Sequence, residues 1–272
     1  MKKAFEIWGW SATVLAHSLS SLIALAAFLG LWALAAYEWL WIPESSVFVL
    51  ILSLVCAIAQ VLVATAALAG TFTIAVQAAD AHAGALSLVR LIRFGRRRFA
   101  ESLLWLIAAS AIGLALAGIF AWVNLHSVEV ASFLTFHSQK PVSYLIIDRC
   151  MIAIEGLIWI AATGSLLSFL MVRYRSGGQH ARQPFGKVLL SGCFKMPFLT
   201  GLLTVLVFGG SAYVLVNWRP MVPAGFWDYS QLAVRVALVL VLLAAGWLFW
   251  LLCLARLNLP GTGPPAESKG TL

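Results

Sequence analysis

The sequence predicts an all-α integral membrane protein with six transmembrane helices and amphipathic cytoplasmic interfacial segments. Three observations support this fold class. First, 62% of the 272 residues are hydrophobic and only 10% are charged, against about 45–50% apolar and about 25% charged in an average soluble domain. Second, the apolar residues form long continuous runs, whereas the strands of a membrane barrel alternate. Third, lysine and arginine gather in alternate connections between those runs, as in polytopic membrane proteins.

Six segments are long enough to cross a bilayer. A helix rises about 1.5 Å per residue, so about 20 apolar residues cross about 30 Å of hydrocarbon. The predicted spans are residues 12–36, 47–76, 102–123, 144–171, 198–217 and 231–255. The first run is longer than the apolar core of a secretory signal, so we expect it to be a retained helix. Residues 1–257 are thus one predicted transmembrane domain, and the proline-containing segment 258–272 is a predicted disordered cytoplasmic tail.

The distribution of basic residues predicts the orientation. With a cytoplasmic N-terminus, fourteen of the eighteen Lys and Arg lie on the cytoplasmic side: Lys2, Lys3, Arg90, Arg93, Arg96, Arg97, Arg98, Arg173, Arg175, Arg182, Lys187, Lys195, Arg256 and Lys269. Four lie outside: Lys140, Arg149, Arg219 and Arg235. This positive-inside pattern predicts a multi-pass protein of a bacterial inner membrane with both termini cytoplasmic. It also accounts for the net charge of +8 without a nucleic-acid partner.

The connection between spans two and three has the pattern of an interfacial helix. Leu86, Val89 and Ile92 recur at three-residue spacing beside a stripe of arginines, so an apolar and a basic face are expected on one helix. Such a helix turns its arginines toward anionic headgroups. The candidate headgroup contacts are Arg90, Arg93, Arg96, Arg97 and Arg98 here, with Arg182, Lys187 and Lys195 between spans four and five. An ordinary basic loop is the alternative interpretation.

Short basic segments precede each of three predicted hairpins. They contain Lys2 to Trp8, Phe94-Gly95-Arg96 and Phe185-Gly186-Lys187. This organisation, and the stretch Arg90 to Leu104 in particular, resembles bacterial multi-pass families built from an interfacial helix plus a hairpin. The membrane domain attached to some glycerophosphodiester phosphodiesterases is one such family. There the hydrolytic site lies in a separate soluble domain, so the resemblance implies a membrane module without catalytic residues.

A few ionisable side chains fall within the predicted spans, where each needs a partner or a function. Asp148, Arg149 and Glu155 lie on span four, and Arg235 lies near the outer start of span six. We expect Arg235 to pair with Glu155 or Asp148 and so to join spans four and six. A helix-packing ion pair is one interpretation of this candidate polar cluster. A transport or substrate pathway is the other, and Gly209-Gly210 could interrupt span five as glycines do in transporters.

Two further polar residues, His17 and Gln60, lie within spans and predict interhelical hydrogen bonds. The chain has no GxxxxGK[ST], HExxH or GxSxG motif, and Cys56, Cys150, Cys193 and Cys253 lack zinc-site spacing. No histidine pair lies at a common depth for haem, so no cofactor or metal is predicted. An intramembrane enzyme would have to use His126, Glu129 and His137 of the outer connection, whose spacing fits no metal template.

These observations lead to one principal functional hypothesis and one alternative. The principal hypothesis is a non-catalytic inner-membrane protein whose basic cytoplasmic face engages anionic lipid or a partner membrane protein. The alternative is a small transporter or lipid-handling protein that uses Asp148, Glu155 and Arg235.

Overall fold

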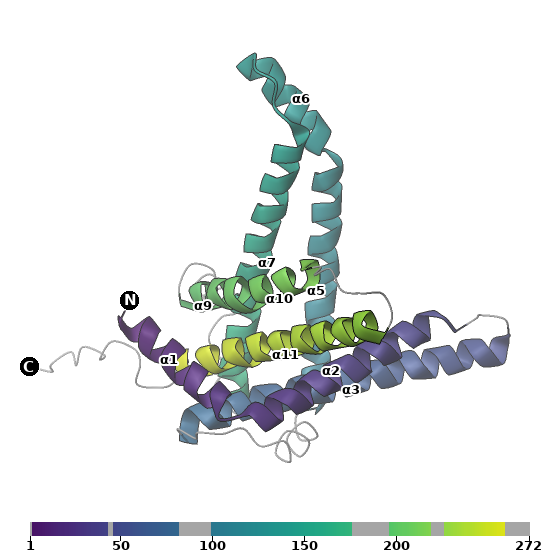
Figure 1. The fold of residues 1–272 in the computed structure, drawn as a ribbon, viewed down its shortest axis with the longest axis vertical. Helices are drawn as coiled ribbons and strands as arrows, with labels where there is room; N and C mark the ends of the chain where they lie inside the picture. The colour runs from purple at the N-terminus through teal and green to yellow at the C-terminus, as the bar shows by residue number, and fades with distance from the viewer. Residues whose placement is uncertain (1, 43–45, 82–98, 176–195, 219–225, 259–272) are drawn as a thin grey trace, which may run out of the picture.

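The computed structural model describes residues 2–42, 46–81, 99–175, 196–218 and 226–258, and all the regular structure in these ranges is helical (Figure 1). The helices are α1 (Lys2–Ala16), α2 (Leu19–Leu40), α3 (Val47–Ala81), α5 (Phe99–Leu125), α6 (Ser127–Ser138), α7 (Tyr144–Arg175), α9 (Met196–Thr204), the π-helical turn η1 (Val205–Gly209), α10 (Gly210–Asn217) and α11 (Phe226–Leu257).

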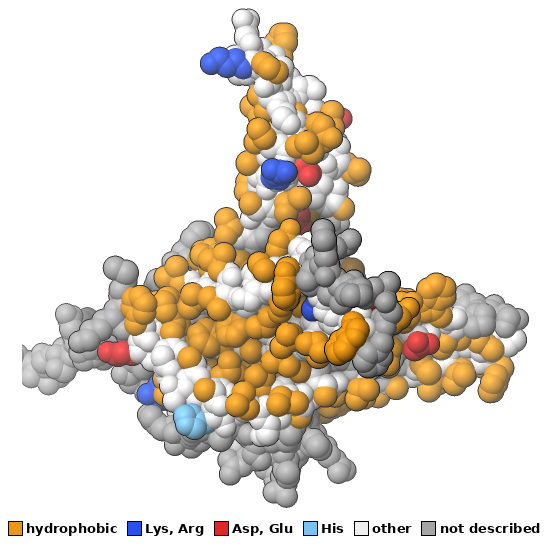
Figure 2. Space-filling model, viewed as in Figure 1, with side chains coloured by type: hydrophobic (Ala, Val, Ile, Leu, Met, Phe, Trp, Pro, Cys, Tyr) orange, Lys and Arg blue, Asp and Glu red, His pale blue; other side chains and the backbone are white. Residues whose placement is uncertain are grey.

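Six helical stretches are long and apolar enough to cross a membrane. They are Leu19–Leu40, Val47–Asp80, Phe99–Leu125, Tyr144–Arg173, Met196–Asn217 and Trp227–Leu257. The predicted six-helix fold class is therefore confirmed, and the protein is a multi-pass helical membrane protein. Hydrophobic side chains cover most of the face seen in Figure 2, as expected of a surface that lipid solvates.

The first predicted span, residues 12–36, is wrong at its start, because the helix breaks at His17 and Ser18. The Ser18 hydroxyl donates to the Val14 carbonyl at 2.7 Å, and Nδ1 of His17 lies 2.8 Å from the Thr13 carbonyl oxygen. Polar side chains that bond the preceding turn compete with the backbone ladder and bend a helix. The residues before the break form α1, a separate helix that contacts α11.

A second departure from the predicted layout lies between spans three and four. Residues 124–143 were expected to be an outer loop, but Ser127–Ser138 forms α6. Its apolar residues are spread around the helix, so no apolar stripe indicated it in the sequence. Gln139 ends α6 in the left-handed conformation, with a φ of 50°. Span five, in contrast, is not interrupted at Gly209-Gly210, because the π-helical turn continues directly into α10.

Helix α11 is the centre of the packed core. Leu251, Leu252 and Leu254 in its second half are fully buried. They belong to one cluster with residues of four other helices, namely Val14 of α1, Leu22 and Leu25 of α2, Phe72 and Ala79 of α3, and Leu167 and Met171 of α7. Helix α9 also packs on α11, so five helices surround its C-terminal half.

Burial falls at the same end of every span. We call this the packed end: residues 19–26 of α2, 69–80 of α3, 102–105 of α5, 165–173 of α7, 200–204 of α9 and 244–257 of α11. These are alternate ends along the chain, so they share one side of an alternating topology, the side predicted to be cytoplasmic. The opposite halves, which we call the splayed end, are largely exposed. There the α5–α6–α7 hairpin rises away from α2, α3 and α11 (Figure 1).

Candidate functional site

The polar cluster predicted within the spans is centred on Glu155 of α7, which is half-buried. Its carboxylate accepts a hydrogen bond from the Asn124 side-chain amide of α5 and another from the Trp159 indole N–H, both at 3.4 Å. Glu155 therefore connects spans three and four. The sequence had not singled out Asn124 or Trp159 as its partners.

Arg235 of α11 has different partners. Its Nε donates to the Leu215 carbonyl at 3.2 Å, and Nη2 donates to the Val216 carbonyl at 2.8 Å. Both carbonyls lie in the last turn of α10, where a helix leaves backbone oxygens unsatisfied and carries partial negative charge. The expected pair of Arg235 with Glu155 or Asp148 is not formed, because the α10 carbonyls satisfy the guanidinium instead.

The other two members of the cluster lie nearer the start of α7. Asp148 is half-buried and Arg149 is exposed. Within the described ranges neither residue has a hydrogen bond or ion pair. The four side chains are thus distributed over separate contacts: Glu155 faces α5, Arg235 holds α10, and no described ion pair joins any two of them.

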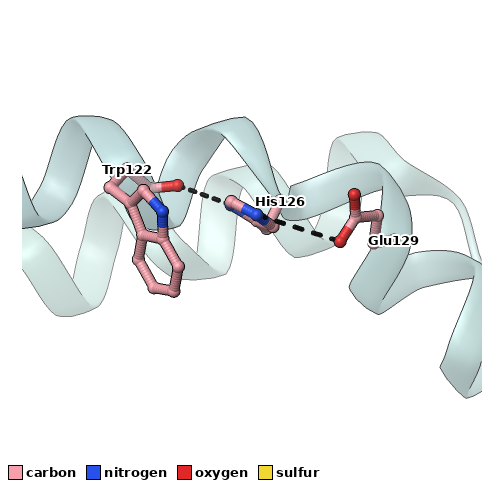
Figure 3. Close-up of polar contacts among 3 residues, drawn as sticks. All are labelled: Trp122, His126 and Glu129. Atoms are coloured by element: carbon pink, nitrogen blue, oxygen red, sulfur yellow. Dashed lines mark hydrogen bonds and ion pairs between the residues drawn. The ribbon is translucent and has the colours of Figure 1, made fainter.

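His126 caps the start of α6 and lies between Trp122 and Glu129 (Figure 3), and His137 lies in the last turn of the same helix. His126 has Nδ1 2.8 Å from the Trp122 carbonyl oxygen, and its Nε2 lies 4.0 Å from a carboxylate oxygen of Glu129. His137 instead stacks on Phe133, with ring centroids 4.2 Å apart. No group of three His, Cys, Asp or Glu that could hold a metal occurs in the described parts of the chain.

Gln60 and His17, the two further polar residues that were predicted to form interhelical hydrogen bonds, behave differently. The Gln60 side chain donates to the Ala35 carbonyl of α2 at 3.1 Å, which confirms the predicted interhelical hydrogen bond. The Trp32 indole donates in return to the Gln60 backbone carbonyl at 3.2 Å. His17 bonds within its own segment instead, because it lies at the break between α1 and α2.

The predicted headgroup contacts Arg90, Arg93, Arg96, Arg97, Arg98, Arg182, Lys187 and Lys195 all lie outside the described residues. Two arginines near the C-terminal ends of α7 and α11, both within the packed end, have defined partners. Arg173 of α7 forms an ion pair with Glu101 of α5 and lies over the Trp105 ring, 5.5 Å from its centroid. Arg256 of α11 lies 5.1 Å from the Trp10 centroid of α1.

These two arginine–tryptophan pairs were not predicted. Both lie at the packed end, and each joins two helices: Arg173 with Trp105 joins α7 to α5, and Arg256 with Trp10 joins α11 to α1. A cation over an indole face is an attractive contact. The Glu101–Arg173 pair could have been predicted from the sequence. Glu101 lies at the start of span three and Arg173 lies at the end of span four, so the two ends of this hairpin are at the same depth.

Comparison with known proteins adds no family. No family model matches the chain, and neither a curated protein nor a solved structure matches it. The resemblance to the membrane domain attached to some glycerophosphodiester phosphodiesterases therefore stays a prediction from sequence.

Proposed function

We propose that the protein is a non-catalytic inner-membrane protein whose basic side, facing the cytoplasm, binds anionic lipid. In this proposal both termini are cytoplasmic and the packed end lies at the inner leaflet. Membrane phospholipid is the partner, and no chemical step is assigned to the protein.

The observation that carries the proposal is where the basic segments attach. Residues 82–98 connect α3 to α5, and residues 176–195 connect α7 to α9. All four helix ends belong to the packed end, so both basic connections begin and end on one side of the protein. Among the described residues, the basic side chains toward the splayed end are Lys140, Arg149 and Arg235.

The electrostatic attraction between the basic residues and an anionic bilayer surface is strong enough to select anionic lipid. A basic residue near an anionic bilayer surface adds about 1 kcal/mol of attraction, which falls off within a Debye length. Several such residues acting together would enrich anionic lipid strongly around the packed end. Arg173 and Arg256 are held by tryptophan rings at this same end, where indoles are common anchors at the membrane interface.

The test removes charge from one basic segment. Arg93, Arg96, Arg97 and Arg98 are changed together to Gln, and lipid retained by the purified protein from nanodiscs of phosphatidylglycerol and phosphatidylethanolamine is measured by native mass spectrometry. We expect the preference of the wild type for phosphatidylglycerol to fall at least about tenfold in the variant. The wild-type preference should also weaken as ionic strength rises.

The matched control removes charge from the other side. Lys140→Gln combined with Arg149→Gln changes two basic residues of the splayed end, and this variant should keep the wild-type preference. Equal preference for both lipids in the wild type would overturn the proposal, as would an undiminished preference in the four-arginine variant.

A further inference from the structure

A partly open apolar cavity of ≈ 790 Å³ lies between α5 and α7. Its lining comes from α5 and α7, with further contributions from α3, α9 and α11. Ligand pockets in proteins have volumes of about 300–1,000 Å³, so the size is that of a binding site rather than a packing defect. Neither the principal nor the alternative hypothesis from the sequence assigned any role to this region.

The lining selects for an apolar occupant. Nearly all of the lining residues are apolar or aromatic, among them Leu106, Ile112, Leu116 and Ile158. Of the hydroxyl groups at the cavity, that of Ser165 is already bonded to the Ala161 carbonyl at 2.8 Å. A polar solute in this cavity would lose its hydration without gaining partners, which is costly.

Glycine and tryptophan shape the wall. A Cβ added at Gly113 of α5 would lie 3.7 Å from the Trp159 ring of α7, an ordinary van der Waals distance, so the indole lies close to α5 at this point. Trp159 also donates to Glu155, which fixes the ring at one end of the cavity. At the other end Trp105 lines the cavity, packs edge-on against Phe169 and lies beside Arg173.

The cavity is at least as long as one leaflet is thick. On α5 the lining residues run from Trp105 to Leu116, a rise of about 16 Å, and on α7 they run from Ile154 to Leu170, a rise of about 24 Å at 1.5 Å per residue. Half of a hydrocarbon core about 30 Å thick is about 15 Å. The end at Trp105 belongs to the packed end, so the leaflet concerned is the one next to the basic segments.

We infer that this cavity holds one acyl chain of a phospholipid, with the headgroup at the Trp105–Arg173 end. The chain lies along α5 toward Trp159, between apolar side chains of the two helices. The cationic side of the protein complements an anionic headgroup there, and this part of the inference rests on the proposed function. The acyl-chain site itself depends only on the cavity and on the membrane setting.

The test fills the cavity from each wall. Ala109 and Ala162 both line it, so Ala109→Phe and Ala162→Phe are made, with Ala111→Phe and Ala153→Phe as controls on exposed positions of the same two helices. Native mass spectrometry after transfer from nanodiscs measures retained lipid. We expect one tightly retained lipid in the wild type and controls, and about tenfold lower retention in both cavity variants. Wild-type retention in both cavity variants would overturn the site.

A second measurement uses the unaltered protein, so it does not depend on how the variants fold. Phosphatidylglycerol carrying a diazirine on its acyl chain is photolysed in nanodiscs, and labelled peptides are mapped. Labelling concentrated at residues 106–116 and 154–166 is expected. Labelling spread evenly over exposed apolar helix surface, such as residues 47–63, would contradict the inference.

The two proposals fail in different ways. If anion preference is absent but the cavity variants lose phosphatidylglycerol and phosphatidylethanolamine equally, the acyl-chain site stands and the proposed headgroup recognition fails. If the cavity variants retain lipid while the four-arginine variant loses its preference, the reverse holds.

Discussion

The packed and splayed ends belong to the same six apolar spans but differ in how closely the helices meet. Leu251 of α11 is fully buried, whereas Leu50 and Leu54 of α3 are more than half exposed. Lipid is as apolar as leucine, so leucine content does not drive helices together. The splayed halves therefore leave much of their apolar surface to lipid.

Small and hydroxylated residues distinguish the packed end. Ala244, Ala245 and Gly246 on α11 permit close approach, and a Cβ at Gly246 would lie 3.0 Å from Cβ of Phe208. Buried Ser168 and Thr204 donate to carbonyls one turn back at 2.7 Å, so they pack without unsatisfied groups. Hydropathy therefore determines which segments insert, and small residues determine where the inserted helices pack.

The largest effect should come from truncating a leucine at the packed end. Leu251→Ala leaves a cavity in the core, so we expect a loss of about 2–5 kcal/mol in the free energy of unfolding. Leu238→Ala lies on the same helix at the splayed end, where the side chain is 45% exposed. This control should cost less than about 1 kcal/mol. Unfolding in mixed detergent micelles measures both, and equal losses would contradict the distinction between the two ends.

Glycine substitutions should differ in sign between the ends. A Cβ at Gly201 would lie 2.6 Å from Cζ2 of Trp250, so Gly201→Ala forces a rigid indole to move and should cost about 1–3 kcal/mol. Gly210 lies on the same span with nothing within 4 Å of its Cβ position. Gly210→Ala should therefore stabilise the helix by up to about 1 kcal/mol. The same unfolding assay decides; destabilisation of similar size at both positions would refute this contrast.

The coupling energies of ion pairs should also be larger at the packed end than at the splayed end, but the difference should be smaller. A double-mutant cycle of Glu101→Gln and Arg173→Gln should give a coupling of about 0.5–1 kcal/mol, because both side chains are about one-third exposed or less. The corresponding cycle for His126→Gln and Glu129→Gln, at 4.0 Å and with Glu129 77% exposed, should give less than about 0.5 kcal/mol. A larger coupling at the His126–Glu129 pair would reverse the expected order.

The smallest effect concerns the hydrogen bond that joins α2 to α3 in their splayed halves. Gln60→Leu removes the donor to the Ala35 carbonyl and should cost about 0.6 kcal/mol. Ser53→Ala is the control, since the Trp39 indole still donates to the Ser53 backbone carbonyl at 2.9 Å after the hydroxyl is lost. We expect no measurable change in that variant. A Gln60→Leu cost above about 2 kcal/mol would mean that the splayed end is held by protein contacts.

The number of spans could be predicted from the sequence, because an apolar run of sufficient length must be helical in lipid. The break at His17 and Ser18 could not, since it depends on hydroxyl and imidazole groups bonding the preceding turn. Helix α6 was not predicted because hydropathy indicates only which segments insert into the membrane. This segment has neither an apolar stripe nor a strong stop signal that would mark it as a helix.

Partner choice within the candidate site was harder to predict than depth. The sequence placed Glu155 and Arg235 within spans at similar depth, but it did not reveal which neighbouring helix each side chain faces. Arg235 donates hydrogen bonds to the carbonyls of α10, and Glu155 accepts one from Asn124. Gln60 was predicted correctly because an amide within a span has few alternatives to an interhelical partner.

Sidedness tests the account most directly, since every proposal places the packed end on the basic side. Epitope tags at the N-terminus, after Asn258 and after Gln139 are probed in intact spheroplasts and again after permeabilisation. We predict that the tag after Gln139 binds antibody in intact spheroplasts, while the other two tags bind only after permeabilisation. Termini on opposite faces, or a tag after Gln139 on the same face as the termini, would contradict it.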